Sequence, residues 1–268
     1  MSKLQVLTIA GSDSGGGAGI QADIKTFQER GVFGTSVITA VTAQNTLGVQ
    51  GIYKVPLEGV QKQLDSIFSD FSIHGIKTGM LVNETYMELV ADELEKYPEI
   101  QLVIDPVMIA KGGAHLMENQ ALETMKFRMV PLATVLTPNI PEAEELSGMA
   151  IQTKEDMKKA AKVLQKLGSK NVIIKGGHIE NDKWARDYLL MADGKERWYE
   201  SPRIATEDTH GTGCTFSACI TAELAKGQSV EKAVEIAKDF IQAAISHPIE
   251  VGHGQGPTNH WAYGEENK

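Results

Sequence analysis

The chain has 268 residues, of which 42% are hydrophobic and 23% are charged. These fractions are typical of globular proteins, and a chain of this length buries a core without disulfides or a structural metal. Its 26 basic and 35 acidic side chains give a formal net charge of −9, which argues against a nucleic acid or an anionic membrane as the main partner. Two cysteines, Cys214 and Cys219, exclude a disulfide scaffold, and the weak apolar start at Leu4–Ala10 excludes a secretory signal. We expect a cytoplasmic protein with no membrane or nucleic-acid partner.

Short apolar runs alternate with longer amphipathic runs along most of the chain. The short runs predict buried strands at Leu4–Ala10, Ser36–Ala43, Ile73–Thr78, Leu102–Asp105, Ala133–Thr137 and Asn171–Lys175. The longer runs predict helices over 19–30, 57–70, 83–97, 118–129 and 154–168, the last with Thr153 and Asp156 as its cap. This alternation predicts a mostly parallel sheet with helices on both faces.

The pattern changes toward the C-terminal end. Asp187–Ala192 and Arg197–Ser201 predict an antiparallel hairpin, since Asp193-Gly194 between them suits a two-residue turn. Two helices are predicted over 212–226 and 230–246, and 251–260 is predicted to be a loop. Because no internal repeat or linker interrupts the chain, we expect residues 1–268 to form a single domain.

Polar and glycine-rich segments follow the predicted strands, at the sheet edge where open α/β folds bind ligands. They are Gly11–Gly19, Gln44-Asn45, Gly79-Met80, Asp105-Pro106, Thr137-Pro138-Asn139 and Lys175-Gly176-Gly177-His178. The first contains Gly17-x-Gly19-x-x-Ala22, a loose form of the dinucleotide-binding motif. However, the second strand ends in Gln44-Asn45, where that fold requires an acidic residue for the ribose, so the pattern disfavours a dinucleotide.

The segment Asp208-Thr209-His210-Gly211-Thr212-Gly213-Cys214 precedes an apolar helix. Its glycines allow a tight turn that exposes N–H groups, and the helix start adds a positive dipole end, so the segment predicts an anion hole for phosphate. The same dipole predicts a lowered thiol pKa for Cys214, which makes it a candidate base or nucleophile. The alternative is a glycine-containing helix start with a buried structural cysteine, and the segment alone leaves both open.

Two carboxylates and two lysines near other strand ends are also ambiguous. Glu142 in Asn139-x-x-Glu142 either holds Mg²⁺ through water or caps a helix, and Asp105 at a strand end is equally open. Lys175 and Lys111 each precede two glycines. Each either reaches nucleotide phosphates in the cleft or lies on the surface.

These segments together resemble a known family. The 208–214 segment resembles the Asp-Thr-x-Gly-Ala/Thr-Gly-Asp signature of ribokinase-like small-molecule kinases, and Asn139-x-x-Glu142 resembles their magnesium motif. Cys214 replaces the final Asp, as in the branch of hydroxymethylpyrimidine/phosphomethylpyrimidine kinases and related bacterial pyridoxal kinases. The resemblance spans about residues 4–260. Further matching segments are 10–23, Thr39–Thr46, Lys77–Leu81 and Asp105–Met108.

The resemblance implies a three-layer α/β/α fold with a mostly parallel sheet, little or no lid and a homodimeric state. It implies ATP and Mg²⁺ as cofactors in thiamine biosynthesis. The implied reaction phosphorylates 4-amino-5-hydroxymethyl-2-methylpyrimidine to its monophosphate and then to its diphosphate.

The resemblance also implies roles for individual residues. Cys214 would be the base, and the N–H groups of Gly211, Thr212, Gly213 and Cys214 would stabilise the transferred phosphoryl group. The implied Mg²⁺ residues are Glu142 and Asp105, and the implied ATP residues are Lys175, Asn139, Thr209 and Lys111. The implied pyrimidine pocket consists of Gln44, Asp23, Ala18, Gly11, Met80 and Val107.

Three other functions fit parts of the pattern. A pyridoxal kinase shares the Cys214 signature, but Ala43-Gln44-Asn45-Thr46 favours the pyrimidine enzyme, since the Gln44 amide offers a donor and an acceptor to an aminopyrimidine. A non-catalytic pyrimidine-binding regulator would not need Glu142 and Lys175. A sugar kinase is disfavoured because Cys214 stands in place of the Asp base.

Overall fold

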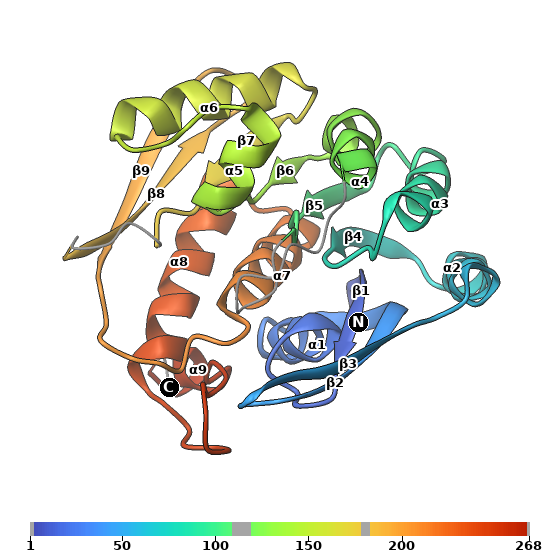
Figure 1. The fold of residues 1–268 in the computed structure, drawn as a ribbon, viewed down its shortest axis with the longest axis horizontal. Helices are drawn as coiled ribbons and strands as arrows, with labels where there is room; N and C mark the ends of the chain where they lie inside the picture. Colours follow the sequence, from blue (N-terminus) through green and yellow to red (C-terminus); the bar gives the residue numbers. More distant parts are fainter. Residues whose placement is uncertain (1–2, 109–118, 178–182, 267–268) are drawn as a thin grey trace.

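The computed structural model of the chain describes residues 3–108, 119–177 and 183–266. In these residues one nine-stranded sheet has the order β3-β2-β1-β4-β5-β6-β7-β8-β9 (Figure 1). Neighbouring strands from β2 to β7 are parallel, whereas β3, β8 and β9 pair antiparallel at the two edges. The strands are β1 (Gln5–Asp13), β2 (Phe33–Asn45), β3 (Gly48–Lys54), β4 (Ile73–Thr78), β5 (Gln101–Ile104), β6 (Val135–Leu136), β7 (Asn171–Ile174), β8 (Trp184–Leu190) and β9 (Glu196–Pro202).

Helices cover both faces of this sheet. Leu64, Val90 and Leu164 belong to one core cluster, on the side of α2, α3 and α6. Phe216 and Phe240 belong to a second cluster, on the side of α7 and α8. The predicted three-layer α/β/α fold is therefore confirmed. The helices are α1 (Gly19–Glu29), α2 (Leu57–Asp70), α3 (Glu84–Leu94), α4 (Asn119–Thr124), α5 (Ile140–Ser147), α6 (Lys154–Lys166), α7 (Thr212–Ala225), α8 (Val230–Ser246) and α9 (Ala262–Glu266).

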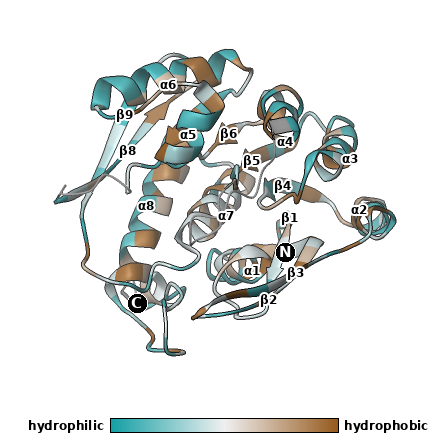
Figure 2. Ribbon diagram, viewed as in Figure 1, coloured by the Kyte–Doolittle hydropathy of each residue, from teal (hydrophilic) through white to brown (hydrophobic). Residues whose placement is uncertain are grey.

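The amphipathic pattern that predicted the helices is visible on the ribbon, where hydrophobic and hydrophilic residues alternate along α6 and α8 (Figure 2). α6 also has the predicted cap. The Asp156 N–H donates to Thr153 Oγ1 at 3.1 Å, and the Thr153 N–H donates to Asp156 Oδ2 at 3.0 Å. This reciprocal pair satisfies two N–H groups that the first helical turn leaves without a partner.

Three local features differ from the predictions. β8 and β9 form the predicted hairpin, but residues 191–195 join them, so the predicted two-residue turn is wrong. The Met191 N–H closes this longer loop by donating to the Lys195 carbonyl. β1 continues to Asp13, because a bulge after Ala10 lets Ser12 and Asp13 pair with β2. β3 was not predicted, since its apolar residues Val49, Ile52 and Tyr53 do not alternate as in a half-buried strand.

Helix α7 packs against β1, β4 and β5. Its first turn lies beside Asp105 and Lys175, which directly follow β5 and β7, and these carboxyl ends of the strands position the site. The 251–260 segment contains no helix or strand, as predicted. Within the described ranges, no helix is both long and apolar enough to cross a bilayer.

Candidate active site

An ion pair joins the ends of β5 and β7. Lys175 Nζ donates to Asp105 Oδ1 at 2.9 Å, and the Thr137 hydroxyl donates to the same oxygen at 3.1 Å. Ser217 Oγ on α7 lies 3.3 Å from the other oxygen, Oδ2. Burial alone would raise the pKa of Asp105, but Lys175 and Lys77 hold it below its usual value. The carboxylate therefore stays ionised at the sheet edge.

The first turn of α7 lies directly against this pair. A Cβ atom added to Gly213 would lie 3.4 Å from Lys175 Nζ and 3.6 Å from Asp105 Oδ2. Burial alone would lower the pKa of the Lys175 ammonium, but Asp105 and Glu142 raise it above its usual value. A permanent positive charge thus lies beside the predicted anion hole.

Glu142 and Asn139 form the cap of α5. The Glu142 N–H donates to Asn139 Oδ1 at 2.9 Å, and the Asn139 N–H donates to Glu142 Oε2 at 2.8 Å. Glu142 therefore caps the helix, which is one of the two roles that the sequence left open. Burial raises the pKa of Glu142 to about 7, with Lys175 lowering it and Asp105 raising it further. Glu142 thus also belongs to the electrostatic group around Lys175.

This group can be tested for its fit to Mg²⁺. Across 3–108, 119–177 and 183–266, no cluster of three or more His, Cys, Asp or Glu side chains could hold a metal ion. Asp105 and Glu142 nevertheless offer carboxylate oxygens, the ligand type that Mg²⁺ prefers. Mg²⁺ is usually held by one or two carboxylates together with nucleotide phosphates and water. The donor set therefore fits a Mg²⁺ ion that arrives with a nucleotide.

At the predicted anion hole, the turn before α7 packs tightly against the loop that follows β1. Gly211 caps α7 with φ +83°, and a Cβ atom there would lie 1.7 Å from the Gly17 carbonyl oxygen, so only glycine fits. The Thr212 hydroxyl and N–H both point to the Thr209 carbonyl, at 2.7 and 3.3 Å. The turn thus places the start of a 14-residue helix against the loop that follows β1.

The predicted lowering of the Cys214 thiol pKa is wrong. Burial raises the pKa of this thiol to about 11, although Lys77 and the Gly19 N–H act in the opposite direction. The loss of water around the sulfur outweighs these favourable contacts. Cys219 is a fully buried core residue, as predicted.

A second ion pair lies entirely inside the protein. Lys77 Nζ bonds both oxygens of Asp23, at 2.9 and 2.8 Å, and the Thr8 hydroxyl donates to Asp23 Oδ2 at 2.6 Å. Both charged side chains are 0% exposed. Asp23 therefore lies below the surface of the predicted pocket, with both oxygens already accepting hydrogen bonds.

Asp13 organises the loop after β1. The N–H groups of Gly15, Gly17 and Ala18 donate to its carboxylate at 2.8, 3.0 and 2.9 Å. His210 Nε2 lies 2.8 Å from its Oδ2 atom. This contact brings the 208–214 segment to the end of β1.

The remaining pocket residues lie around the ends of β1, β2, β4 and β5. A Cβ atom on Gly11 would lie 2.4 Å from Met80 Cε, so the missing side chain makes room for the methionine. Gln44 is partly buried, and its Nε2 atom lies 3.1 Å from His210 Nε2. Val107 is partly buried in the segment after β5, two residues beyond Asp105.

Comparison with known proteins gives the family. The sequence model of the family described as phosphomethylpyrimidine kinase matches residues 13–259. The chain belongs to the phosphomethylpyrimidine kinase family. It is 61% identical over 261 residues to the hydroxymethylpyrimidine/phosphomethylpyrimidine kinase of Haemophilus influenzae, covering 97% of each chain. The predicted family and its phosphotransferase class are thus confirmed.

Two solved structures confirm the ribokinase-like fold. Bacillus subtilis pyridoxal kinase, in an ADP complex, superposes with a TM-score of 0.91 at 41% identity, over 97% of this chain and 98% of that one. Phosphomethylpyrimidine kinase from Clostridium difficile 630 has a TM-score of 0.81 at 41% identity, over 91% of this chain and all of that one. The two structures carry different names at the same identity, so the fold alone does not choose the substrate.

Most of the predicted site residues follow the carboxyl ends of neighbouring strands, and Asp23 lies beneath them on α1. Lys111 lies outside the described residues. Lys77, Asp13 and His210 lie inside the segments that resemble the family, but the sequence alone predicted no role for them. A lysine within the apolar run 73–78 was a usable signal, because a buried charge needs a partner. Nothing in the spacing of Asp13 and His210 indicated their contact.

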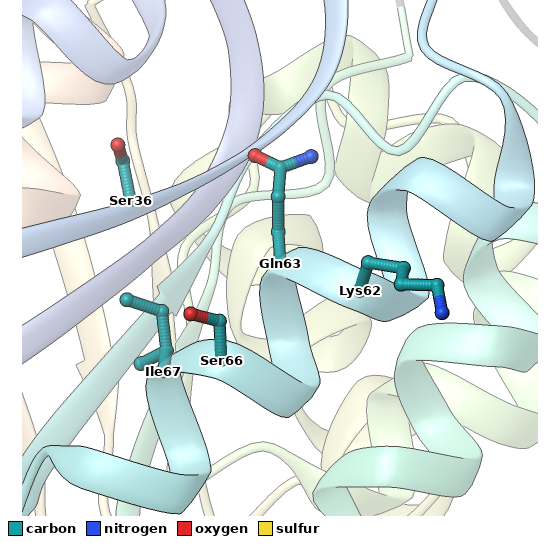
Figure 3. Close-up of a pocket in the computed structure, with 5 residues that line it drawn as sticks. All are labelled: Ser36, Lys62, Gln63, Ser66 and Ile67. Atoms are coloured by element: carbon teal, nitrogen blue, oxygen red, sulfur yellow. The ribbon is translucent and has the colours of Figure 1, made fainter.

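A surface depression beside α2 lies apart from this family site (Figure 3). Its lining residues are Ser36, Lys62, Gln63, Ser66 and Ile67. Gln63 Oε1 accepts from the Ile38 N–H at 2.8 Å, and Gln63 Nε2 donates to the Ile38 carbonyl at 3.1 Å. The glutamine therefore satisfies the part of β2 that precedes its pairing with β3, which is a structural role.

Proposed function

We propose that this chain transfers a phosphoryl group from ATP to the hydroxymethyl group of 4-amino-5-hydroxymethyl-2-methylpyrimidine. A second ATP then converts the monophosphate to the diphosphate, in thiamine biosynthesis. The observation that carries the proposal is the meeting of the Lys175–Asp105 pair with the first turn of α7 at one sheet edge. Phosphoryl transfer depends mainly on this kind of charge neutralisation and alignment.

The phosphate side of the site would combine fixed positive charge with backbone donors. Lys175 would pair with the ATP phosphates, and the N–H groups of Gly211, Gly213 and Cys214 would stabilise the transferred group. The Thr212 N–H would join them by leaving the Thr209 carbonyl, which lies 3.3 Å away. Bound Mg²⁺ would neutralise phosphate charge, held by Asp105 and Glu142. The further nucleotide contacts in this proposal are Asn139, Thr209 and Lys111.

Cys214 would act as the base for the attacking hydroxyl. A thiol with a pKa of about 11 is protonated at neutral pH, so only a small thiolate fraction accepts the proton. A thiolate with such a high proton affinity is a strong base, which offsets part of its low population. Lys77 and the Gly19 N–H favour the thiolate that this role needs.

The pyrimidine would lie between the ends of β1, β2 and β4, with Gln44 contacting its polar edge. Asp23 would support this pocket from below, through its bonds to Lys77. The other residues of the proposed wall are Gly11, Ala18, Met80 and Val107.

Mass spectrometry of the products tests the proposal. The purified protein is incubated with Mg-ATP and equimolar hydroxymethylpyrimidine and pyridoxal, with the Lys175→Met variant as control. We expect the pyrimidine monophosphate first and the diphosphate later, both strongly reduced in the variant. Pyridoxal phosphate alone would instead support vitamin B6 salvage, the candidate favoured by the pyridoxal kinase neighbour. No product from a folded protein would support a non-catalytic pyrimidine-binding regulator.

We also infer a homodimer, formed through the β2–β3 hairpin. β3 is an edge strand, and this hairpin exposes Val41, Leu47, Val49, Ile52 and Tyr53. An exposed apolar strand edge is a site for pairing, and two-fold symmetry is the commonest arrangement of a homo-oligomer. In sedimentation velocity we expect Ile52→Lys to shift the protein to monomer, whereas Phe127→Lys, at an exposed site elsewhere, leaves the dimer intact.

A cytoplasmic location is inferred from the cysteines. Cys214 and Cys219 are both free thiols. Reducing compartments keep thiols free, whereas disulfides form in oxidising ones. Cell fractionation tests the location directly.

A further inference from the structure

His210 Nε2 has two neighbours that it cannot both satisfy. Asp13 Oδ2, at 2.8 Å, belongs to an ionised carboxylate and can only accept a hydrogen bond, whereas Gln44 Nε2, at 3.1 Å, can only donate one. An imidazole nitrogen carries either one hydrogen or one lone pair. With the amide nitrogen toward the ring, one of the two contacts is therefore unfavourable.

The other end of the same amide has a matching conflict. The Thr42 hydroxyl has one hydrogen, but it lies 3.0 Å from the Ser12 carbonyl oxygen and 3.2 Å from Gln44 Oε1, which are both acceptors. Turning the Gln44 carboxamide by half a rotation exchanges its oxygen and nitrogen. Nε2 then donates to Thr42, whose own hydrogen goes to Ser12, so this conflict is resolved. Oε1 then faces the single His210 Nε2–H, which it shares with Asp13 Oδ2 in a three-centre bond, and the unfavourable contact of two donors is removed.

Asp13 decides which ring nitrogen carries the hydrogen. Burial would raise the pKa of Asp13, but its bonds to His210 and to the Gly15 and Ala18 N–H groups hold it below its usual value. An ionised carboxylate at 2.8 Å requires a hydrogen on His210 Nε2. The ring is also held in place, because a Cβ atom on Gly17 would lie 2.4 Å from His210 Cδ2.

We propose that His210 is a positioning residue whose Nε2–H, directed by Asp13, fixes the Gln44 carboxamide with its oxygen toward the ring. His210 also precedes Gly211, so one residue would couple the amide that contacts the pyrimidine to the segment that contacts phosphate. The part of this inference that concerns the pyrimidine rests on the proposed function. The part that concerns the orientation of the ring and the amide does not.

The orientation is tested without substrate. The ¹⁵N chemical shifts of the imidazole ring in the wild-type protein identify the His210 tautomer. We expect hydrogen on Nε2 throughout neutral pH. A ring that carries its hydrogen on Nδ1 alone would overturn the inference, whatever the enzyme phosphorylates.

The positioning role is tested by kinetics in a double-mutant cycle. We expect His210→Ala to raise the KM for the pyrimidine by up to about tenfold, the usual effect of one lost hydrogen bond. The KM for ATP should rise less than about twofold. His210→Gln, which keeps a donor near Nε2, is expected to recover most of the loss. In a Gln44→Ala background, His210→Ala is expected to add nothing further.

The controls separate the two proposals. His74→Gln changes an exposed histidine and is expected to leave both KM values unchanged. Equal effects of His210→Ala on both KM values, or full additivity with Gln44→Ala, would overturn the positioning role. If the wild-type protein does not phosphorylate the pyrimidine, the proposed function fails, and the tautomer still decides the orientation.

Discussion

Two carboxylate–lysine pairs of nearly equal length lie in this protein and differ in their access to solvent. Asp23 and Lys77 are 2.8 Å apart and both 0% exposed. Asp105 and Lys175 are 2.9 Å apart, with side chains 3% and 16% exposed. We call Asp23–Lys77 the inner pair and Asp105–Lys175 the outer pair. In the inner pair the ammonium bonds both carboxylate oxygens, whereas Lys175 bonds one oxygen and is partly exposed. The same chemistry therefore stabilises the fold in one place and can meet a ligand in the other.

Charged groups of both pairs influence the pKa of the Cys214 thiol. Lys77 lowers its thiol pKa, while Asp23 and Asp105 raise it in addition to burial. The charge of Lys175 is in turn favoured by Cys214. Substitutions in either pair are therefore expected to act on this thiol as well as on their own partner.

The inner pair should dominate stability. We expect Lys77→Met to lower the free energy of unfolding by about 3–5 kcal/mol, because it leaves the buried Asp23 carboxylate without its partner. Urea denaturation at pH 7 measures the change. The double variant Lys77→Met/Asp23→Leu is the control, and it should recover much of the loss because neither charge remains. A loss below about 1 kcal/mol in the single variant is typical of a solvent-exposed ion pair and would contradict the burial of the Asp23–Lys77 pair.

Cys214 should matter for turnover rather than for binding. We expect Cys214→Ala to lower kcat by about 10²- to 10⁴-fold, the usual contribution of a positioned base, while ATP affinity stays unchanged. Steady-state kinetics and calorimetric titration with a non-hydrolysable nucleotide measure the two quantities. Wild-type turnover in the variant would refute the base role, and the buried Cys219→Ala variant controls for loss of a thiol.

The outer pair should dominate activity. Removing one charge-stabilising donor costs about 10²- to 10³-fold in kcat, so we expect Lys175→Met to lose activity in that range. The free energy of unfolding should fall less in Lys175→Met than in Lys77→Met, since Lys77 remains to stabilise the ionised form of Asp105. Comparing kcat and urea midpoints of the two variants tests this reversal. Equal losses of unfolding free energy in the two variants would show that both pairs contribute equally to stability.

The thiol between the pairs should titrate at high pH. Because the reactive form is the thiolate and the pKa of Cys214 is about 11, iodoacetamide labelling should accelerate about tenfold per pH unit from pH 7 to 10. Peptide mass spectrometry of Cys214 follows the rate. A plateau already at pH 7–8 would mean that the helix start outweighs burial, as the sequence alone suggested.

Sequence patterns predicted what is set locally and missed what is set by distant neighbours. The α6 cap was predictable because Thr153 and Asp156 are three residues apart. The convergence of Asp105, Glu142 and Lys175 was predictable because the ends of parallel strands share one edge. The raised Cys214 pKa was not, since burial depends on what packs over the sulfur. Nor was the contact of His210 with Asp13, 197 residues away in the chain.

The contact of Gly211 with the Gly17 carbonyl has a consequence for synthesis. Every strand of the described sheet ends by Pro202, before α7 begins at Thr212. On the ribosome the N-terminal part of a chain emerges first, so the entire sheet is available before the segment that completes the phosphate site. The nascent chain should therefore stay catalytically silent until its last quarter emerges and meets a loop made at the very start of translation.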